Sequence, residues 1–262
     1  MKKLYGKSAI WHALAWIGLY VAGMNIALQF AGGLDDLAGK TVPQLLVPVA
    51  VGLALAVWAT AFILRSGLGE TFGLCRFRGS WKGFLFFLPL LAISLTNLKD
   101  GVGLPARLEL CVLMALNMAV AGYVEELIFR GFLFRAMAKD NLRSAVIVSA
   151  VTFGAGHIVN LGNTADWAGV LLQVGYAIAI GFLFTAIVYK GGSLWPCIIS
   201  HMVVNGTSVF AAESGPFTDL ITRLFGQATP QLADIVSSVL LAAVSGAYAL
   251  WLWKKTGSPE KV

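Results

Sequence analysis

Long apolar runs separated by short polar segments dominate the chain. A helix that crosses a bilayer needs roughly 20 apolar residues. By that measure the pattern predicts about eight spans, at residues 9–31, 43–64, 83–98, 108–138, 144–161, 167–189, 194–212 and 234–253. Strands of a membrane barrel would instead alternate apolar and polar positions over about ten residues. Because a lipid-embedded segment must satisfy its own backbone hydrogen bonds, we predict an all-α, polytopic integral membrane helical bundle.

Composition points the same way. Of the 262 residues, 58% are hydrophobic and only 12% are charged, and the mean hydropathy is +0.79. A soluble domain of this length would need more polar surface than this chain can supply. The first apolar run is long and has no clear small-residue cleavage site, so it predicts a retained span. We expect a single membrane domain over 1–262, without internal repeats, whose partners are the lipid bilayer and not nucleic acid.

The positive charges predict an orientation. If the N-terminus is cytoplasmic and eight spans alternate, 14 basic residues fall on inner segments: Lys2, Lys3, Lys7, Arg65, Arg76, Arg78, Lys82, Arg135, Lys139, Arg143, Lys190, Lys254, Lys255 and Lys261. Only four fall on outer segments: Lys40, Lys99, Arg107 and Arg223. Cytoplasmic loops of membrane proteins carry an excess of Lys and Arg. We therefore expect an inner (plasma) membrane protein with both termini in the cytoplasm.

The stretch "AGYVEELIFRGFLF", residues 121–134, places three charges inside a predicted span. Ionisable groups at that depth are costly, so they usually have a partner and a function. Glu126 and Arg130 are four residues apart and share one helical face, whereas Glu125 points roughly 140° away from Arg130. The spacing predicts an ion pair between Glu126 and Arg130. Glu125 then needs another neighbour.

Later spans carry three more polar candidates: His157 in "FGAGH", and His201 and Asn205 in "HMVVN". The four-residue spacing puts His201 and Asn205 on one face. At 1.5 Å per residue, Glu125 lies roughly 15 Å above Arg135, and the two histidines lie at comparable heights above the basic segments that precede them. We therefore expect these side chains to meet at a site that opens on the cytoplasmic side.

These residues form an ordered set: Glu-Glu-x-x-x-Arg at 125–130, Phe-x-x-x-His at 153–157 and His-x-x-x-Asn at 201–205. The set resembles the three signatures of the CAAX protease and bacteriocin-processing (Abi) family, and the similarity covers about 108–212. The resemblance implies an intramembrane glutamate endopeptidase related to the type 2 CAAX prenyl protease, acting on a peptide or membrane-protein substrate.

The resemblance also implies roles. Glu125 would be the general base for a water molecule, assisted by His157. His201 and Asn205 would form the oxyanion hole, while Glu126 and Arg130 would hold the site together. No cofactor or metal is expected under this reading.

Two alternatives remain open. Glu125, His157 and His201 could instead hold zinc as a two-His, one-Glu site. The chain could also be a non-catalytic membrane scaffold or regulator, for example of a sensor kinase or in bacteriocin immunity.

Overall fold

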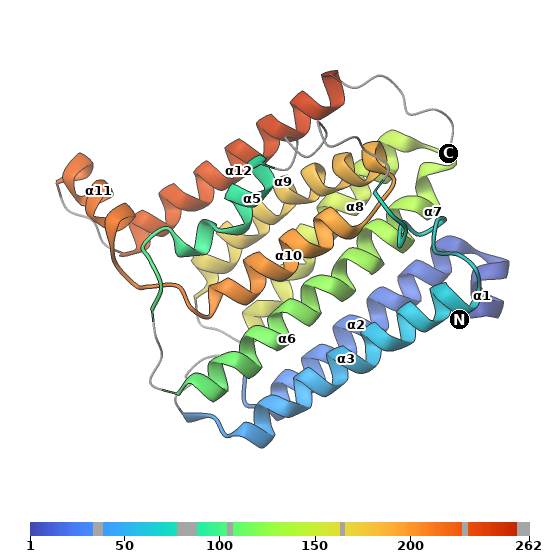
Figure 1. Cartoon of the computed structure of the whole chain (residues 1–262), viewed down its shortest axis with the longest axis horizontal. Helices are drawn as coiled ribbons and strands as arrows, with labels where there is room; N and C mark the ends of the chain where they lie inside the picture. Colours follow the sequence, from blue (N-terminus) through green and yellow to red (C-terminus); the bar gives the residue numbers. More distant parts are fainter. Residues whose placement is uncertain (34–38, 78–87, 104–106, 163–165, 227–229, 256–262) are drawn as a thin grey trace.

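A computed structural model describes residues 1–33, 39–77, 88–103, 107–162, 166–226 and 230–255. In these ranges the chain forms a bundle of helices with no strand, as predicted (Figure 1). Six helical segments are long and apolar enough to cross a membrane. They are α2 (Ala9–Phe30), α3 (Val42–Arg65), α6 continued by η4 and α7 (Leu108–Ala138), α8 continued by η5 (Leu142–Gly162), α9 (Trp167–Gly191) and α12 (Pro230–Lys255).

Of the two other predicted spans, one is shorter than the sequence pattern indicates and the other lies partly outside the described residues. α10 (Trp195–Ser208) has 14 residues, or about 21 Å of helix, which is less than the roughly 30 Å of a bilayer core. The run at 83–98 is described only from residue 88, where it forms α5 (Leu88–Ser94) and the short η3 (Thr96–Leu98). The described chain therefore contains six helices of spanning length, and part of the span predicted at 83–98 lies outside the described residues.

The central element is α6, which packs against α3 on one side and α10 on the other (Figure 1). α9 packs against both α8 and α12, and α2 packs against α3 and η4. Gly122 permits the close approach of α6 and α10, because a Cβ there would lie 3.1 Å from the backbone of His201. Gly154 likewise permits a close α8–α9 contact, because a Cβ there would lie 2.8 Å from the amide nitrogen of Ile178. Gly156 has no such neighbour.

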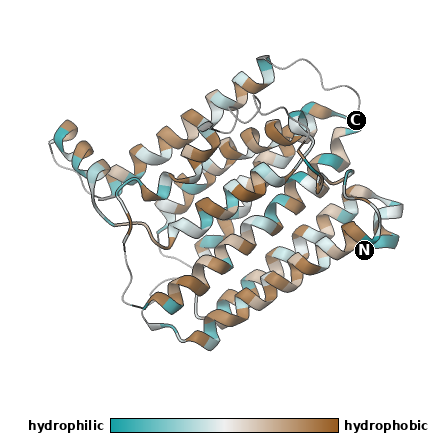
Figure 2. Cartoon of the chain, viewed as in Figure 1, coloured by the Kyte–Doolittle hydropathy of each residue, from teal (hydrophilic) through white to brown (hydrophobic). Residues whose placement is uncertain are grey.

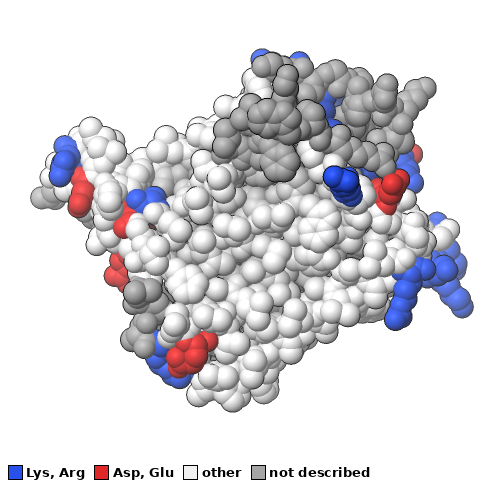
Figure 3. All heavy atoms as spheres, viewed as in Figure 1, with Lys and Arg blue, Asp and Glu red and all other residues white. Residues whose placement is uncertain are grey.

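The distribution of polarity fits a membrane protein. Apolar residues cover the sides of the bundle, and many large ones are exposed, including Trp58, Leu116 and Leu250 (Figure 2). Charged side chains gather at the two ends of the molecule in Figure 3, with an uncharged band between them. The N-terminus, α1 (Lys2–Lys7), α7 (Arg135–Ala138) and the last residues of α12 lie at one end, which we call the basic end (Figure 1). α11 (Pro216–Phe225) lies at the other, which we call the distal end.

His12 lies near the basic end, where its position suggests an interfacial side chain. It is instead fully buried, and its Nε2 accepts a hydrogen bond of 3.1 Å from the indole of Trp16. The rings of Phe62 and Phe132 pack against it with centroids 4.8 and 4.9 Å away. His12 is therefore part of an aromatic core between α2, α3 and η4.

Candidate functional site

The charged stretch lies where α6 (Leu108–Glu126) gives way to a π-helical segment, η4 (Leu127–Phe134). π-Helical turns are rare and are frequent at functional sites. The wider turn changes which carbonyls are bonded within the helix, and the carbonyl of Phe129 accepts a hydrogen bond of 2.9 Å from the Ser149 hydroxyl of α8. η4 is thus fixed both by its own helix and by a neighbour.

The predicted pair of Glu126 and Arg130 is present. Nη1 of Arg130 donates to Oε1 of Glu126 over 2.8 Å, and both side chains are completely buried. The guanidinium lies 4.1 Å from the ring centroid of Phe153 and 5.5 Å from that of Phe184. Stacking against aromatic faces stabilises a buried cation that has few other partners. Two aromatic rings and one carboxylate therefore hold this arginine inside the bundle.

His201 joins the two glutamates. Its Nδ1 lies 2.8 Å from Oε1 of Glu126, and its Nε2 lies 3.5 Å from Oε2 of Glu125. Glu126 is an ion-pair partner of Arg130 and accepts hydrogen bonds as a carboxylate, so Nδ1 carries the proton of that contact. This bond fixes the ring and presents Nε2 to Glu125.

The additional neighbour that Glu125 needs is Tyr20 of α2. The Tyr20 hydroxyl donates to Oε1 of Glu125 over 2.5 Å. Oε2 of Glu125 has no hydrogen-bond partner in the described chain and faces His201. Sequence reasoning missed Tyr20, which lies 105 positions earlier. The one available signal was a lone hydroxyl halfway along an apolar run.

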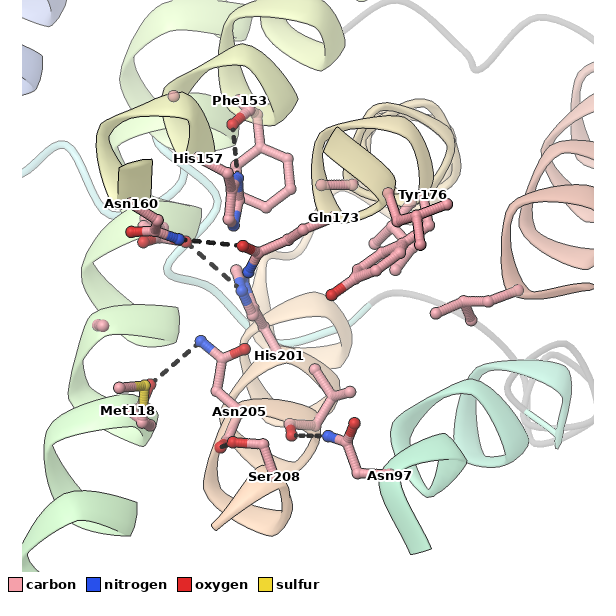
Figure 4. A pocket seen from close by; sticks show the side chains of 18 of the residues that line it. Asn97, Met118, Phe153, His157, Asn160, Gln173, Tyr176, His201, Asn205 and Ser208 are labelled. Carbon is pink, nitrogen blue, oxygen red and sulfur yellow. Dashed lines mark hydrogen bonds and ion pairs between the residues drawn. The ribbon is translucent and has the colours of Figure 1, made fainter. Parts of the chain in front are cut away.

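His157 ends α8 at its junction with η5 (His157–Gly162). Its Nδ1 lies 3.1 Å from the carbonyl oxygen of Phe153. Because a carbonyl can only accept, Nδ1 carries the proton and Nε2 of the neutral ring keeps its lone pair. In Figure 4 the rings of His157 and His201 point into the same space.

Asn205 lies one turn beyond His201 on α10, as predicted. Its Nδ2 donates to the backbone carbonyl of Met118 over 3.2 Å, which links α10 to α6 (Figure 4). A primary amide carries two hydrogens. One serves the link to α6, and the other remains for a partner in the cavity that this side chain lines.

A cavity of about 510 Å³ brings four of the six candidate side chains together: Glu125, His157, His201 and Asn205 all line it. Glu126 and Arg130 do not, since they lie fully buried behind His201 and Phe153. In the described part of the chain, no three His, Cys, Asp or Glu side chains are grouped so that they could bind a metal ion.

The cavity runs in the direction opposite to the one predicted. From Glu125 it extends past Asn205 and Ser208 toward Lys99 and Asp234, at the distal end. The expectation of an opening on the same side as the termini is therefore wrong. The reason is that the prediction used only the height of each site residue above the basic end, calculated from the number of residues along its helix. It could not show that Arg130 and its aromatic neighbours fill the space on that side.

Comparison with known proteins adds one finding. Residues 107–207 match the family model described as type II CAAX prenyl endopeptidase, Rce1-like. The matched range agrees with the core predicted from the three signatures and contains all six candidate site residues. No curated protein and no solved structure matches the chain.

Proposed function

Since residues 107–207 carry the core of the Rce1-like family of type II CAAX prenyl endopeptidases, we propose that this integral membrane protein is an intramembrane endopeptidase that hydrolyses peptide bonds with a glutamate-activated water. The observation that carries the proposal is the setting of Glu125. Its carboxylate lies at the inner end of the cavity. Oε1 accepts a hydrogen bond from the Tyr20 hydroxyl, and Oε2 faces His201. A carboxylate that is held through one oxygen, and whose other oxygen has no hydrogen-bond partner in the described chain, suits a general base.

In the proposed reaction Glu125 takes a proton from water, and the resulting hydroxide adds to the carbonyl carbon of the scissile peptide. Negative charge develops on the carbonyl oxygen. The second amide hydrogen of Asn205 is available to donate to it, as is Nε2 of His201 when that ring is doubly protonated. Such donors, fixed before the reaction, stabilise the charge without reorganisation.

Collapse of the tetrahedral intermediate breaks the C–N bond. Glu125 then returns the proton to the leaving amine, so that one water is consumed and two peptides are formed. His157 lines the same cavity, and its unprotonated Nε2 can accept a hydrogen bond from the water or relay the proton.

Glu126 and Arg130 act as positioning residues in this scheme. Glu126 fixes the tautomer and orientation of His201 through Nδ1, in the way that a carboxylate orients a histidine in other catalytic sites. Arg130 pairs with the Glu126 carboxylate and holds it in place.

The direct test is cleavage by purified protein in detergent or lipid discs, with a peptide library as substrate and mass spectrometry of the products. Glu125→Gln keeps the shape of the side chain and removes its basicity. Glu109→Gln is the matched control, because Glu109 is an exposed carboxylate on the same helix, paired with Arg107.

We expect products with the wild type and with Glu109→Gln, and none with Glu125→Gln. Full cleavage by Glu125→Gln would contradict the glutamate mechanism. A cellular function that Glu125→Gln preserves, with no cleavage by any variant, would indicate a scaffold or regulator instead.

A further inference from the structure

Most of the cavity lies in the distal half of the bundle. α2 contributes lining residues from Tyr20 to Leu28, in its second half, and α12 contributes them from Asp234 to Leu241, in its first half. α9 likewise lines the cavity from Gly169 to Phe184. The α2 and α12 segments lie in the distal half, because α2 begins at the basic end whereas α12 ends there. The α9 segment starts at the distal end and reaches past the middle of its helix.

The other half is closed. Arg130 lies against the rings of Phe153 and Phe184, and its partner Glu126 has no exposed surface. Beyond Arg130 the side chains of Phe132, Leu133 and Phe134 are buried as well. Within the described chain, the cavity lining includes no residue of the basic end.

The mouth of the cavity is polar. Asn160 donates to Gln173 over 3.0 Å in the wall between η5 and α9, and Asn97 and Ser208 add further polar groups. Lys99 and Asp234 form an ion pair of 3.4 Å across the mouth, where the Asp234 side chain is 66% exposed. A lining of this kind holds water, which hydrolysis consumes, and it accommodates the polar backbone of an extended peptide.

The ends of the bundle differ in charge. The described basic end carries Lys2, Lys3, Lys7, Arg65, Arg76, Arg135, Lys139, Arg143, Lys190 and Lys254, but only Glu70 and Asp140 of opposite sign. The distal end carries Lys40, Lys99, Arg107 and Arg223 together with Asp100, Glu109, Asp166, Glu213, Asp219 and Asp234. The excess of Lys and Arg assigns the basic end to the cytoplasm.

From these observations we infer that the catalytic cavity opens on the non-cytoplasmic face of the membrane. The inference about substrates rests on the proposed endopeptidase function. The substrate is a polypeptide segment exposed on that face, such as part of an exported protein or the outer flank of a membrane protein. A C-terminal tail anchored at the cytoplasmic leaflet would meet the closed end of the bundle instead.

Cysteine labelling in right-side-out membrane vesicles tests on which side of the membrane the cavity opens, and this measurement does not require enzymatic activity. Ser208→Cys places a thiol at the mouth, and Ser144→Cys is the matched control at the basic end; both serines are exposed. Cys75 is replaced by Ala in both variants, since Cys111 and Cys197 are buried. A membrane-impermeant maleimide should label Ser208→Cys at once and Ser144→Cys only after permeabilisation. The reverse pattern would overturn the inference, as would a Ser208→Cys thiol that stays unlabelled under both conditions.

Substrate access is tested with the same vesicles. A peptide library added to right-side-out vesicles should yield products that are absent with Glu125→Gln, and inside-out vesicles should yield none. Products from inside-out vesicles alone would contradict the inference. Absence of products in both orientations, and with the detergent-purified protein, would contradict the endopeptidase function, while the labelling pair would still decide the side on which the cavity opens.

Discussion

The Tyr20 hydroxyl donates a hydrogen bond of 2.5 Å to Glu125 across 105 positions of sequence. Tyr20 belongs to α2, outside residues 107–207 that match the family. The carboxylate proposed as general base is therefore oriented by a residue from outside the family core.

Tyr20→Phe should lower kcat with little change in KM, because the ring still fills its space while Glu125 loses its tether. A hydrogen bond to a charged group contributes about 1.5–3 kcal/mol, which corresponds to a loss of roughly 10- to 150-fold. Tyr123→Phe is the matched control, since its hydroxyl bonds to Thr60 between α3 and α6, away from the cavity. Equal effects of the two substitutions on kcat would indicate that Tyr20 has only a structural role.

Arg130→Ala should unfold the protein more readily. It leaves Glu126 buried with no cation beside it, at a cost of about 3–5 kcal/mol, and it empties the space between Phe153 and Phe184. Thermal unfolding in detergent measures this effect, with the exposed Arg143→Ala as the control. An Arg130→Ala protein with the wild-type Tm and no activity would argue for direct participation of Arg130 in the chemistry.

Asn205→Ala should reduce kcat by about 10²–10³, the usual effect of removing one oxyanion donor, while substrate binding changes little. Asn97→Ala is a suitable control. The Asn97 amide also donates to a backbone carbonyl of a neighbouring element, that of Val204, so this variant loses a similar link without losing the proposed donor. Comparable losses of kcat in both variants would remove Asn205 from the proposed oxyanion hole.

Gly154→Ala should destabilise the α8–α9 contact by about 1–3 kcal/mol, the common cost of overpacking a filled interface. Its new Cβ would lie 2.8 Å from the Ile178 nitrogen and 3.0 Å from the Val174 oxygen, both of which belong to the backbone and cannot move aside cheaply. Gly156→Ala, two residues later, meets nothing within 4 Å and should leave Tm unchanged or slightly higher. Unfolding curves of the pair test the helix contact independently of activity.

Activity should survive stringent chelation if Glu125 activates water directly. The zinc alternative uses Glu125, His157 and His201, and the described chain does not group three such side chains as metal ligands. Elemental analysis of active protein, before and after chelation, decides the question. One zinc per chain, lost together with activity and restored with it, would establish the metal mechanism in place of the one proposed.

The sequence by itself determined the class of this protein and the local part of its site. Apolar runs of spanning length admit few structures in lipid, because backbone hydrogen bonds must be made within each segment. The pairing of Glu126 with Arg130 was equally predictable, since residues four apart on a helix are neighbours whatever surrounds them. The ordered motifs of Glu125, His157, His201 and Asn205 indicated the family whose model residues 107–207 match.

Tertiary packing decided the rest. Contacts between helices depend on crossing angles and depths that no local spacing encodes, so the sequence could not reveal that Tyr20 binds Glu125 or that His201 bridges both glutamates. The same limit explains why the cavity does not extend toward the termini, contrary to the prediction. A count of residues along each helix gave similar depths for the site residues, but the shape of the space around them is set by side chains from several helices at once. In the described chain, Arg130 and the rings of Phe153 and Phe184 fill the space toward the basic end, and the cavity extends toward the other.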